Sequence, residues 1–302
     1  MRDRFGSFEL ERRIGAGGMA ETFVAVRRGY GDIEQRVCLK RILPEWQRDA
    51  DVVRMFLEEG RVAARLRHST IVQVIEAGEH DGVPFLALEL IDGVDLRALL
   101  VDVRRLPPTL LATIALDLAT ALEVAHRAGV LHRDVSPANV LVSLAGEIKL
   151  ADFGIARASD RERRTELGMA RGKAAYLSPE YVATGNATPA SDLFALGVTL
   201  FEAATGARPF AARTELASLE RARLGDHTPI TVLAPDIAPA LATAIERLLT
   251  SAPAARFPSA DALFDELAHL APPPSMRRAV GALVSEVRAR RDERLRANAL
   301  SP

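Results

Sequence analysis

The spacing of apolar residues changes near residue 92 and divides the chain into two parts. Before this point, short runs of β-branched and other apolar residues alternate with polar turns, which predicts a sheet. After it, apolar residues recur at helical spacing over segments bounded by proline or glycine. We therefore expect an α+β fold, with a sheet lobe over about residues 8–91 and a larger, mostly helical lobe over about residues 92–271.

These patterns predict the following elements. The strands of the first part are Phe8–Ile14, Glu21–Val26, Arg36–Ile42, Val72–Ala77 and Phe85–Leu90, and its one helix is Asp51–Leu66. The helices of the second part are Leu96–Val103, Leu110–Ala128, Ala190–Thr205, Ala238–Leu249 and Ala260–Ala271, with short strands at Val140–Val142 and Ile148–Leu150. Polar residues 158–171 show no period and are expected to form a mobile loop.

Three consecutive prolines at positions 272–274 predict a boundary before a tail, residues 272–302. Within the tail, the apolar residues Val280, Leu283, Val284 and Val287 fall at helical spacing, and residues 275–302 hold seven arginines against three acidic residues. Such a stripe usually faces a core, which favours a terminal helix that packs on the body. A dimerisation helix and a basic juxtamembrane segment of a longer protein are the alternatives.

Composition narrows the class of protein. The 302 residues are 48% hydrophobic and 26% charged, so the chain can bury a sizeable core. The formal net charge of −1 lacks the basic excess of a nucleic-acid-binding protein. The single cysteine, Cys38, excludes a disulfide framework and favours a cytoplasmic location. The apolar segment Leu110–Ala125 is interrupted by Asp117 and Glu123, and is expected to be a buried core helix of a soluble protein rather than a membrane span.

Lysine is unusually rare. Of the 39 basic residues only Lys40, Lys149 and Lys173 are lysines. Since arginine supplies the other positive charges, we consider for each lysine whether its position needs a lysine side chain. For Lys149 we expect only a strand-surface position.

Several motifs carry candidate chemistry. The first is the glycine-rich segment 14–22 between two predicted strands, where backbone amides can approach phosphates without interference from Cβ atoms. Alone it also fits an ordinary hairpin turn, and the strand that follows it argues against a Rossmann or Walker phosphate loop. The motifs downstream are Val37–Lys40, Glu59 in the predicted helix, His132–Asn139, Asp152–Gly154 and Ser178–Glu180.

In order and spacing this set closely resembles the protein-kinase signature, in the form found in bacterial eukaryotic-like (Hanks-type) serine/threonine kinases. The resemblance spans about residues 8–271 and implies a bilobal kinase domain over residues 1–271, with its active site in the cleft between the lobes. It implies ATP and Mg²⁺ as cofactors, with Mn²⁺ as an alternative, and a protein substrate with a Ser or Thr acceptor. It also implies a location on the cytoplasmic side of the membrane if the chain is part of a longer receptor kinase.

The resemblance assigns roles to individual residues. Lys40 would contact the α and β phosphates and pair with Glu59, Asp134 would accept or orient the proton of the attacking hydroxyl, and Asn139 and Asp152 would hold Mg²⁺. The residues implied to contact the nucleotide are Ile14, Gly15, Gly17, Gly18, Ala20, Thr22, Cys38, Lys40, Glu59, Leu88, Glu89, Ile91 and Leu141, with backbone groups of residues 89–91 at the adenine edge. The scaffold residues implied are His132, Phe153, Glu180, Asp192 and Arg256.

Three positions depart from the family pattern. Ala20 replaces the third glycine of the loop, and Ser136 stands where serine/threonine kinases have a catalytic lysine. Lys173 stands where the family usually has threonine, beside the catalytic aspartate. We therefore hypothesise that Lys173 replaces the lysine absent at Ser136; a solvated loop lysine is the alternative.

Control by phosphorylation is also implied. Arg133 precedes Asp134, as in kinases whose activation loop is phosphorylated, and Thr165 and then Ser159 are the candidate phosphosites. A homodimer for trans-autophosphorylation fits this scheme. The rival functions are a pseudokinase that acts as a nucleotide-binding scaffold and a small-molecule kinase; the segment Ser178–Glu180 together with Arg256 argues against the second.

Overall fold

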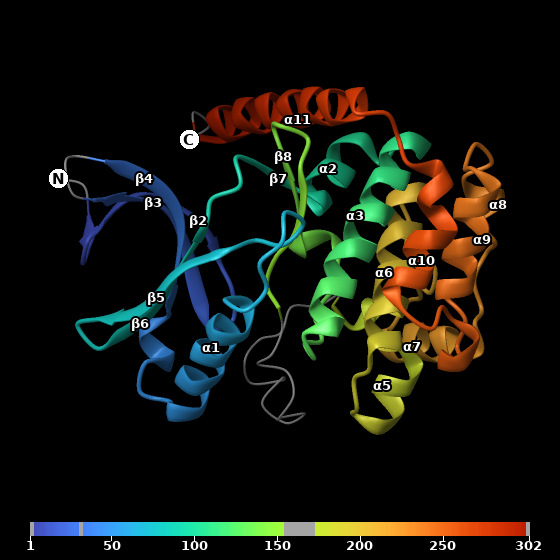
Figure 1. Ribbon diagram of the computed structural model, residues 1–302, viewed down its shortest axis with the longest axis horizontal. Helices are drawn as coiled ribbons and strands as arrows, with labels where there is room; N and C mark the ends of the chain where they lie inside the picture. Colours follow the sequence, from blue (N-terminus) through green and yellow to red (C-terminus); the bar gives the residue numbers. More distant parts are fainter. Residues whose placement is uncertain (1–2, 30–32, 154–172, 300–302) are drawn as a thin grey trace. The chain divides into compact units, whose positions relative to one another are not determined.

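The computed structural model describes residues 3–29, 33–153 and 173–299. The chain forms two compact units (Figure 1). Of the described residues, unit 1 comprises 3–29, 33–91 and 153, and unit 2 comprises 92–152 and 173–299. The candidate phosphosites Ser159 and Thr165 lie outside the described residues.

Unit 1 is built on a six-stranded antiparallel sheet of order β1-β2-β3-β4-β6-β5. Its strands are β1 (Arg4–Phe5), β2 (Phe8–Ala16), β3 (Ala20–Arg28), β4 (Glu34–Ile42), β5 (Val74–His80) and β6 (Val83–Glu89). Between β4 and β5 the chain forms a short 3₁₀ turn, η2 (Pro44–Trp46), and the helix α1 (Ala50–Ala63). The side chain of Asp49 caps α1 by accepting hydrogen bonds from two backbone N–H groups of its first turn.

The two faces of this sheet bury different clusters, because side chains alternate along each strand. One face carries an aromatic cluster that includes Phe5, Phe8 and Phe85. The other face is covered by α1, whose Val52 and Phe56 pack with Ala20, Ile42 and Leu86. A Cβ atom at Gly60 would meet Leu86 Cδ2 at 2.3 Å, so glycine at this position lets α1 lie close to β6.

Unit 2 is mostly helical. Its elements before residue 172 are β7 (Gly93–Asp95), α2 (Leu96–Val103), α3 (Pro108–Arg127), η3 (Pro137–Asn139), β8 (Val140–Ser143) and β9 (Ile148–Leu150). The later helices are η5 (Lys173–Tyr176), α5 (Pro179–Thr184), α6 (Pro189–Thr205), α7 (Glu215–Leu224), α8 (Ile230–Leu233), α9 (Pro239–Leu248), η6 (Pro253–Ala255), α10 (Ala260–Leu267), η7 (Ala268–Leu270) and α11 (Ser275–Ala299). The strands β7, β8 and β9 form a separate antiparallel sheet in that order.

The helix α3 forms the centre of unit 2. It contacts α6, α10 and β9, and most of its residues are buried. Among the described residues it is the one helix long and apolar enough to cross a membrane by length and composition. The expected burial of the segment Leu110–Ala125 is therefore confirmed.

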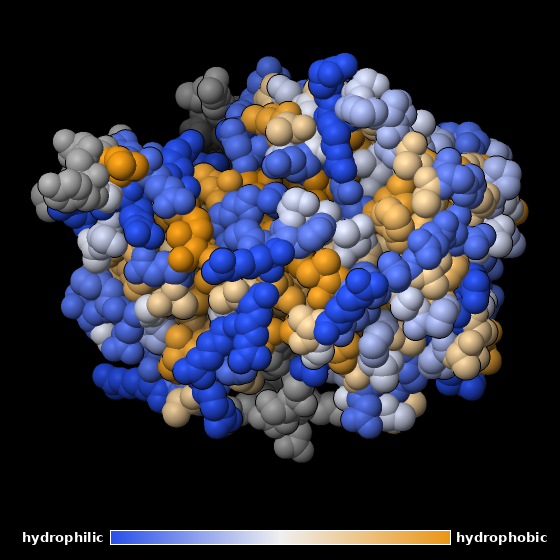
Figure 2. Space-filling model, in the orientation of Figure 1, coloured by the Kyte–Doolittle hydropathy of each residue, from blue (hydrophilic) through white to orange (hydrophobic). Residues whose placement is uncertain are grey.

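The tail helix α11 packs on unit 2, against β7, β8, α2 and α3. Its stripe faces inward: Val280, Val284 and Val287 are at most 2% exposed. Of the alternatives raised by the sequence, packing on the body is the one the structure supports. Figure 2 shows hydrophilic residues over much of the visible surface, with hydrophobic patches scattered among them, as expected when the apolar stripes of helices face a core.

Arginines on α11 form ion pairs with acidic residues of unit 2. Arg277 donates to both carboxylate oxygens of Asp117, at 2.5 and 2.9 Å, and Arg294 donates to both oxygens of Asp102, at 2.6 and 2.8 Å. Arg288 pairs with Asp92. The arginine excess of the tail is thus matched by three acids of the body.

One expectation about a single residue is wrong. Lys149 on β9 does not lie at the surface but is 6% exposed, because β9 packs against α3. Its four-carbon stem is compatible with such a position.

Candidate active site

The predicted pair of Lys40 and Glu59 is formed in unit 1. Lys40 Nζ lies 2.7 Å from Glu59 Oε1, and the two side chains are 14% and 8% exposed. Lys40 is supplied by β4 and Glu59 by α1, which packs on the same face of the sheet. Because both groups are largely removed from water, loss of either partner would leave a buried charge without compensation.

Strand register places four of the other predicted residues of unit 1 on the face that carries Lys40. Thr22 on β3 is paired with Lys40, and Gly15 on β2 is paired with Thr22. One step along, Cys38 is paired with Leu88 of β6. Residues that pair directly across antiparallel strands share a face, so these side chains line one surface beside the ammonium.

The glycine-rich turn lies at the end of this surface. Ile14 is 41% exposed, and Gly15, Gly17 and Gly18 are exposed as well. A Cβ atom at Gly15 would meet nothing within 4 Å, so the glycine is not required by packing inside the protein. Without Cβ atoms at these exposed positions, a ligand can approach the backbone of the turn closely.

Residues 89–91 begin with the last residue of β6, Glu89. The N–H of Glu89 donates to the carbonyl of Gln73 at 2.8 Å, and the Glu89 side chain accepts from the N–H of Gln73. The Glu89 N–H is therefore already used in a bond within unit 1. Ile91 is partly buried at the end of unit 1.

In unit 2 the structure brings Asp134 and Asn139 together. Asn139 Nδ2 donates to the backbone carbonyl of Asp134 at 2.7 Å and to its Oδ2 at 3.0 Å. The turn between them begins with Pro137, whose fixed φ suits the first position of η3. These contacts hold the Asp134 carboxylate in one orientation.

Asp192, at the start of α6, fixes the loop that carries Asp134. Its carboxylate accepts hydrogen bonds from the N–H groups of His132 and Arg133, at 2.8 and 2.7 Å. His126 Nε2 lies 2.9 Å from the same carboxylate. Arg133 has a φ of 63°, a conformation that is unfavourable for a side chain of this size and that the Asp192 bonds stabilise.

His132 is fully buried beneath the loop. Its Nδ1 accepts from the N–H of Asp134 at 3.2 Å, and its Nε2 lies 2.9 Å from the carbonyl of Ala151, so Nε2 carries the proton and donates. Burial lowers the pKa of His132 below its ordinary value, although Asp192 and Asp134 oppose the shift. A neutral, buried ring is a structural support, as expected from the sequence.

The β8–β9 hairpin brings the two predicted metal ligands to the same end of a small sheet. Val140 of β8 pairs with Leu150 of β9, Asn139 directly precedes β8, and Asp152 lies two residues after β9. The N–H of Ala151 donates to the carbonyl of Asn139 at 2.8 Å. Leu141, a predicted nucleotide contact, lies on β8.

These residues fit a magnesium ion. The Asn139 amide nitrogen is used in the bonds to Asp134, so its Oδ1 is the atom that would coordinate a cation. Asp152 is exposed and adds a carboxylate, which gives the oxygen donors that Mg²⁺ prefers.

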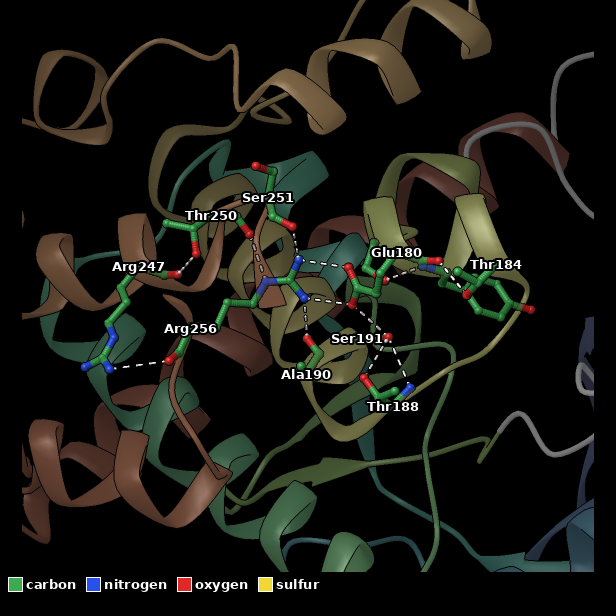
Figure 3. Close-up of polar contacts among 11 residues, drawn as sticks. Glu180, Thr184, Thr188, Ala190, Ser191, Arg247, Thr250, Ser251 and Arg256 are labelled. Carbon is green, nitrogen blue, oxygen red and sulfur yellow. Dashed lines mark hydrogen bonds and ion pairs between the residues drawn. The ribbon is translucent and has the colours of Figure 1, made fainter. Parts of the chain in front are cut away.

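A buried ion pair supports the segment after Lys173 (Figure 3). Arg256 donates to both oxygens of Glu180, at 2.8 and 2.9 Å, and also to the carbonyls of Ala190, Thr250 and Ser251. Arg256 is 1% exposed. Desolvation is the largest single influence and opposes ionisation of Glu180. The hydrogen bonds and charge of Arg256, together with hydrogen bonds from the Glu180 backbone and Ser178, outweigh it, so the pKa of this carboxyl lies below its ordinary value.

Comparison with known proteins identifies the family and the fold of the chain. The family model of the protein kinase domain matches residues 8–267. The chain belongs to the protein kinase family. The kinase domain of PknI from Mycobacterium tuberculosis, a solved structure, has a TM-score of 0.67 and 31% identity, and the match covers 89% of this chain and 98% of that one. The expected bilobal α+β kinase fold is therefore confirmed.

Curated relatives come from two bacterial groups. The serine/threonine-protein kinase PknA of M. tuberculosis is 35% identical over 268 residues, which are 87% of this chain and 61% of PknA. PknL of the same species is 38% identical over 221 residues, 73% of this chain and 54% of PknL. The tyrosine-protein kinase MasK of Myxococcus xanthus is 36% identical over 275 residues, 87% of this chain and 43% of MasK. The chain thus spans about half the length of these relatives, and the resemblance to bacterial kinases of eukaryotic type is confirmed.

Two positions depart from the kinase pattern inside unit 2. Ser136 is 3% exposed, and its Oγ has no hydrogen-bond partner in the part of the chain that the structure describes. The backbone of Lys173 begins η5, while its side chain lies outside the described residues.

Three contacts were not expected from the sequence. They are the His126 bond to Asp192, the bond from Tyr176 to Glu202, and the bond from Trp46 to the glycine-rich turn. The spacing of His126 and Asp192 gave no signal, because 66 residues separate them. Burial and the Glu202 carboxylate both raise the pKa of Tyr176, so this phenol stays protonated and donates.

Proposed function

We propose that this kinase domain transfers the γ-phosphoryl group of ATP to Ser or Thr hydroxyls of proteins. The observation that carries the proposal is the fixed Asp134 carboxylate, held by Asn139 on one side and by a loop backbone bonded to Asp192 on the other. An aspartate fixed in this way is suited to accept or orient the proton of an attacking hydroxyl.

Each of the two units supplies residues with a distinct role in this reaction. Lys40, held by Glu59, would contact the α and β phosphates, and Asn139 and Asp152 would hold Mg²⁺. When bound, MgATP supplies the transferable phosphoryl group, and the cation offsets the charge that develops on it. The apolar residues that share a face with Lys40 would receive the adenine.

Transfer of labelled phosphate from ATP to a generic protein acceptor tests the proposal. The variant Asp134→Asn keeps the size of the side chain and the backbone bond to Asn139, but it removes the carboxylate. We expect phosphate transfer by the wild type and a loss of about 10²–10⁴-fold in the variant. Incorporation no higher than in a control without the kinase would favour the pseudokinase alternative, and equal incorporation above that level would show that transfer does not need the Asp134 carboxylate.

The identity of the acceptor needs its own test. The names of PknA and PknL favour Ser or Thr, whereas the name of MasK includes tyrosine. Pro137 matches the serine/threonine type of catalytic loop. Phosphoamino-acid analysis of the labelled acceptor is expected to give phosphoserine and phosphothreonine, and phosphotyrosine alone would overturn this part of the proposal.

We further propose that Lys173 supplies the cation that other kinases place at position 136. The support is the paired departure, together with the burial of Ser136, which carries no charge. Removing such a cation costs a few kcal/mol of transition-state stabilisation, or about 10²–10³-fold in kcat. The variant Lys173→Ala is expected to lose this activity, and Ser136→Lys in the same chain is expected to restore part of it; full activity in Lys173→Ala would contradict the idea.

Regulation and assembly complete the proposal. We propose that a homodimer phosphorylates Thr165 or Ser159 in trans. We also propose that the domain works in the cytoplasm, and the single cysteine of the chain supports this location. Mass spectrometry after incubation with MgATP, at several protein concentrations, tests the phosphorylation. An unmodified segment 158–171 in active protein would remove this part.

A further inference from the structure

The only tryptophan of the chain contacts the glycine-rich turn. Trp46 lies in η2, the connector between β4 and α1, and its indole Nε1 donates to the carbonyl of Gly18 at 2.8 Å. From the same connector, the N–H of Leu43 donates to the carbonyl of Met19 at 2.9 Å. Two successive carbonyls of the turn are therefore held from one short segment.

Packing reinforces these bonds. Met19 and Trp46 are both partly buried against the cluster that contains Ile42 and Phe56. The turn itself is closed by a bond from the N–H of Gly17 to the carbonyl of Ala20, at 2.8 Å. The turn is thus held by a hydrogen bond within itself, and the Trp46 side chain connects it by a second hydrogen bond to a separate element.

The connector also lies between the two residues of the predicted phosphate-binding pair. Lys40 precedes it on β4, and Glu59 follows it on α1, and these residues are joined at 2.7 Å. A bond from Trp46 to Gly18 therefore links the glycine-rich turn to the segment on which the Lys40–Glu59 pair depends. Trp46 lies outside every kinase motif identified in the sequence.

We infer that Trp46 is a positioning residue for nucleotide binding: its indole N–H fixes the Gly18 carbonyl and presets the turn whose amides receive the phosphates. This inference rests on the proposed function, since it assumes that the turn binds a nucleotide. A fixed turn loses less conformational freedom when the ligand binds, which strengthens binding. One hydrogen bond of this kind corresponds to a change of about two- to tenfold in affinity.

Two variants separate the hydrogen bond from the packing. Trp46→Phe removes the N–H donor but keeps an aromatic ring, whereas Met19→Leu alters the packing partner and leaves the donor in place. Without nucleotide, we expect faster amide hydrogen exchange over residues 15–20 in Trp46→Phe than in the wild type or in Met19→Leu. Exchange in α9 serves as the internal reference, because a general loss of stability would raise it too.

Nucleotide binding gives the second measurement. Calorimetric titration with MgADP is expected to show affinity about two- to tenfold weaker in Trp46→Phe, with Met19→Leu near the wild type. In turnover, the KM for MgATP should rise by the same factor while the KM for the protein acceptor is unchanged. A purely structural role would instead lower kcat through a smaller active fraction and leave the KM for MgATP as it is.

The unmodified protein provides a third measurement, because Trp46 is its sole tryptophan. Tryptophan emission is expected to change on titration with MgADP and to saturate at the calorimetric affinity. If the wild type binds MgADP but Trp46→Phe matches it in exchange, affinity and KM, the inference is wrong. If the wild type binds no MgADP, the proposed function fails, and the exchange measured without nucleotide still decides whether Trp46 holds the turn.

Discussion

At the scale of single residues, the rare lysines differ in how well the sequence predicts their surroundings. Lys40 is paired with a buried carboxylate, as a residue for phosphate contact requires. Lys149 is buried in a strand, where no lysine chemistry was expected. A lysine ammonium is a compact charge on a flexible stem, and arginine cannot replace it at every site. Scarcity thus marks positions where the side chain is constrained, but it does not separate catalytic from structural constraint.

The role of the Lys40–Glu59 pair can be tested by comparing substitutions of Glu59 and of a second buried glutamate in unit 1. Glu59→Gln removes the charge that holds Lys40, so we expect kcat/KM for MgATP to fall about ten- to hundredfold. Glu21→Gln is the matched control, because Glu21 is also buried but accepts its 2.8 Å hydrogen bond from Arg41. Steady-state kinetics with a protein acceptor makes the comparison, and an equal loss in both variants would assign Glu59 a merely structural role.

At the scale of elements, helices and strands are predicted best from the sequence where buried residues recur at a regular spacing. The helix α2 and the strand β9 have the predicted bounds, and the predicted helix over Asp51–Leu66 is observed at Ala50–Ala63. The helices α5, α7 and α8 were not predicted. In α7 only Ala222 is buried, so no apolar stripe marks it, and α8 has four residues. The strands β1 and β7 have two and three residues, too few for an alternation to be recognised.

The same limit applies to the candidate site. Residues that belong to contiguous motifs, such as Asp134 and Asn139, could be assigned from order and spacing. The support from His126 and the tie from Trp46 depend on tertiary packing, which a local pattern does not contain. The fixed orientation of Asp134 is likewise a property of the folded loop.

The Glu180–Arg256 pair lends itself to a double-mutant cycle. Arg256→Met leaves a largely buried carboxylate without its bidentate partner, so we expect a loss of about 3–5 kcal/mol in the free energy of unfolding. Glu180→Gln is expected to cost less, since its amide still accepts from Arg256. In the double variant the two losses should not add, and a coupling of about 0.5–3 kcal/mol measured by urea unfolding would show this. Strict additivity would mean that the two residues act independently.

The contact between α11 and the β8–β9 turn gives an element-scale prediction. A Cβ atom at Gly281 would meet the backbone carbonyl of Leu144 at 2.1 Å, and a carbonyl in a tight turn cannot rotate away. Overpacking of this kind lowers the free energy of unfolding by about 1–3 kcal/mol. The higher helix propensity of alanine at this position raises it by about 1 kcal/mol, so we expect a net loss. We therefore expect Gly281→Ala to speed hydrogen exchange over residues 280–287. Ser285→Ala, on the exposed side of α11, should leave it unchanged, and equal exchange in the two variants would show that the contact is not tight.

At the scale of the whole molecule, charge is balanced but unevenly placed. The net charge is −1, yet the tail is rich in arginine and the body supplies Asp92, Asp102 and Asp117 to meet it. In each pair the arginine side chain stays 37–54% exposed, and ion pairs open to water on one side contribute little individually, about 0–1 kcal/mol. The pH dependence of stability is therefore expected to come from buried groups, among which His132 and Glu180 have shifted pKa values.

The direction of this dependence follows from the two shifts. Burial lowers the pKa of His132 in the native protein below its ordinary value of 6.5. In the pH range between 6.5 and this lower native pKa, His132 is protonated in the unfolded chain but neutral in the native protein. Stability then falls as pH falls, by about 1.4 kcal/mol per pH unit once the unfolded histidine is protonated. The pKa of Glu180 is also lowered, so its contribution is present above its ordinary value of 4.5 and is lost only at more acidic pH.

Urea unfolding followed by circular dichroism of the helical unit separates these contributions between about pH 7 and pH 5. His132→Gln keeps one acceptor and one donor but does not titrate, so its stability should depend less steeply on pH than that of the wild type. His269→Gln, at an exposed position, is the control and should retain the wild-type slope. If His132→Gln shows that slope as well, the buried imidazole is not the group that makes the stability of the protein depend on pH in this range.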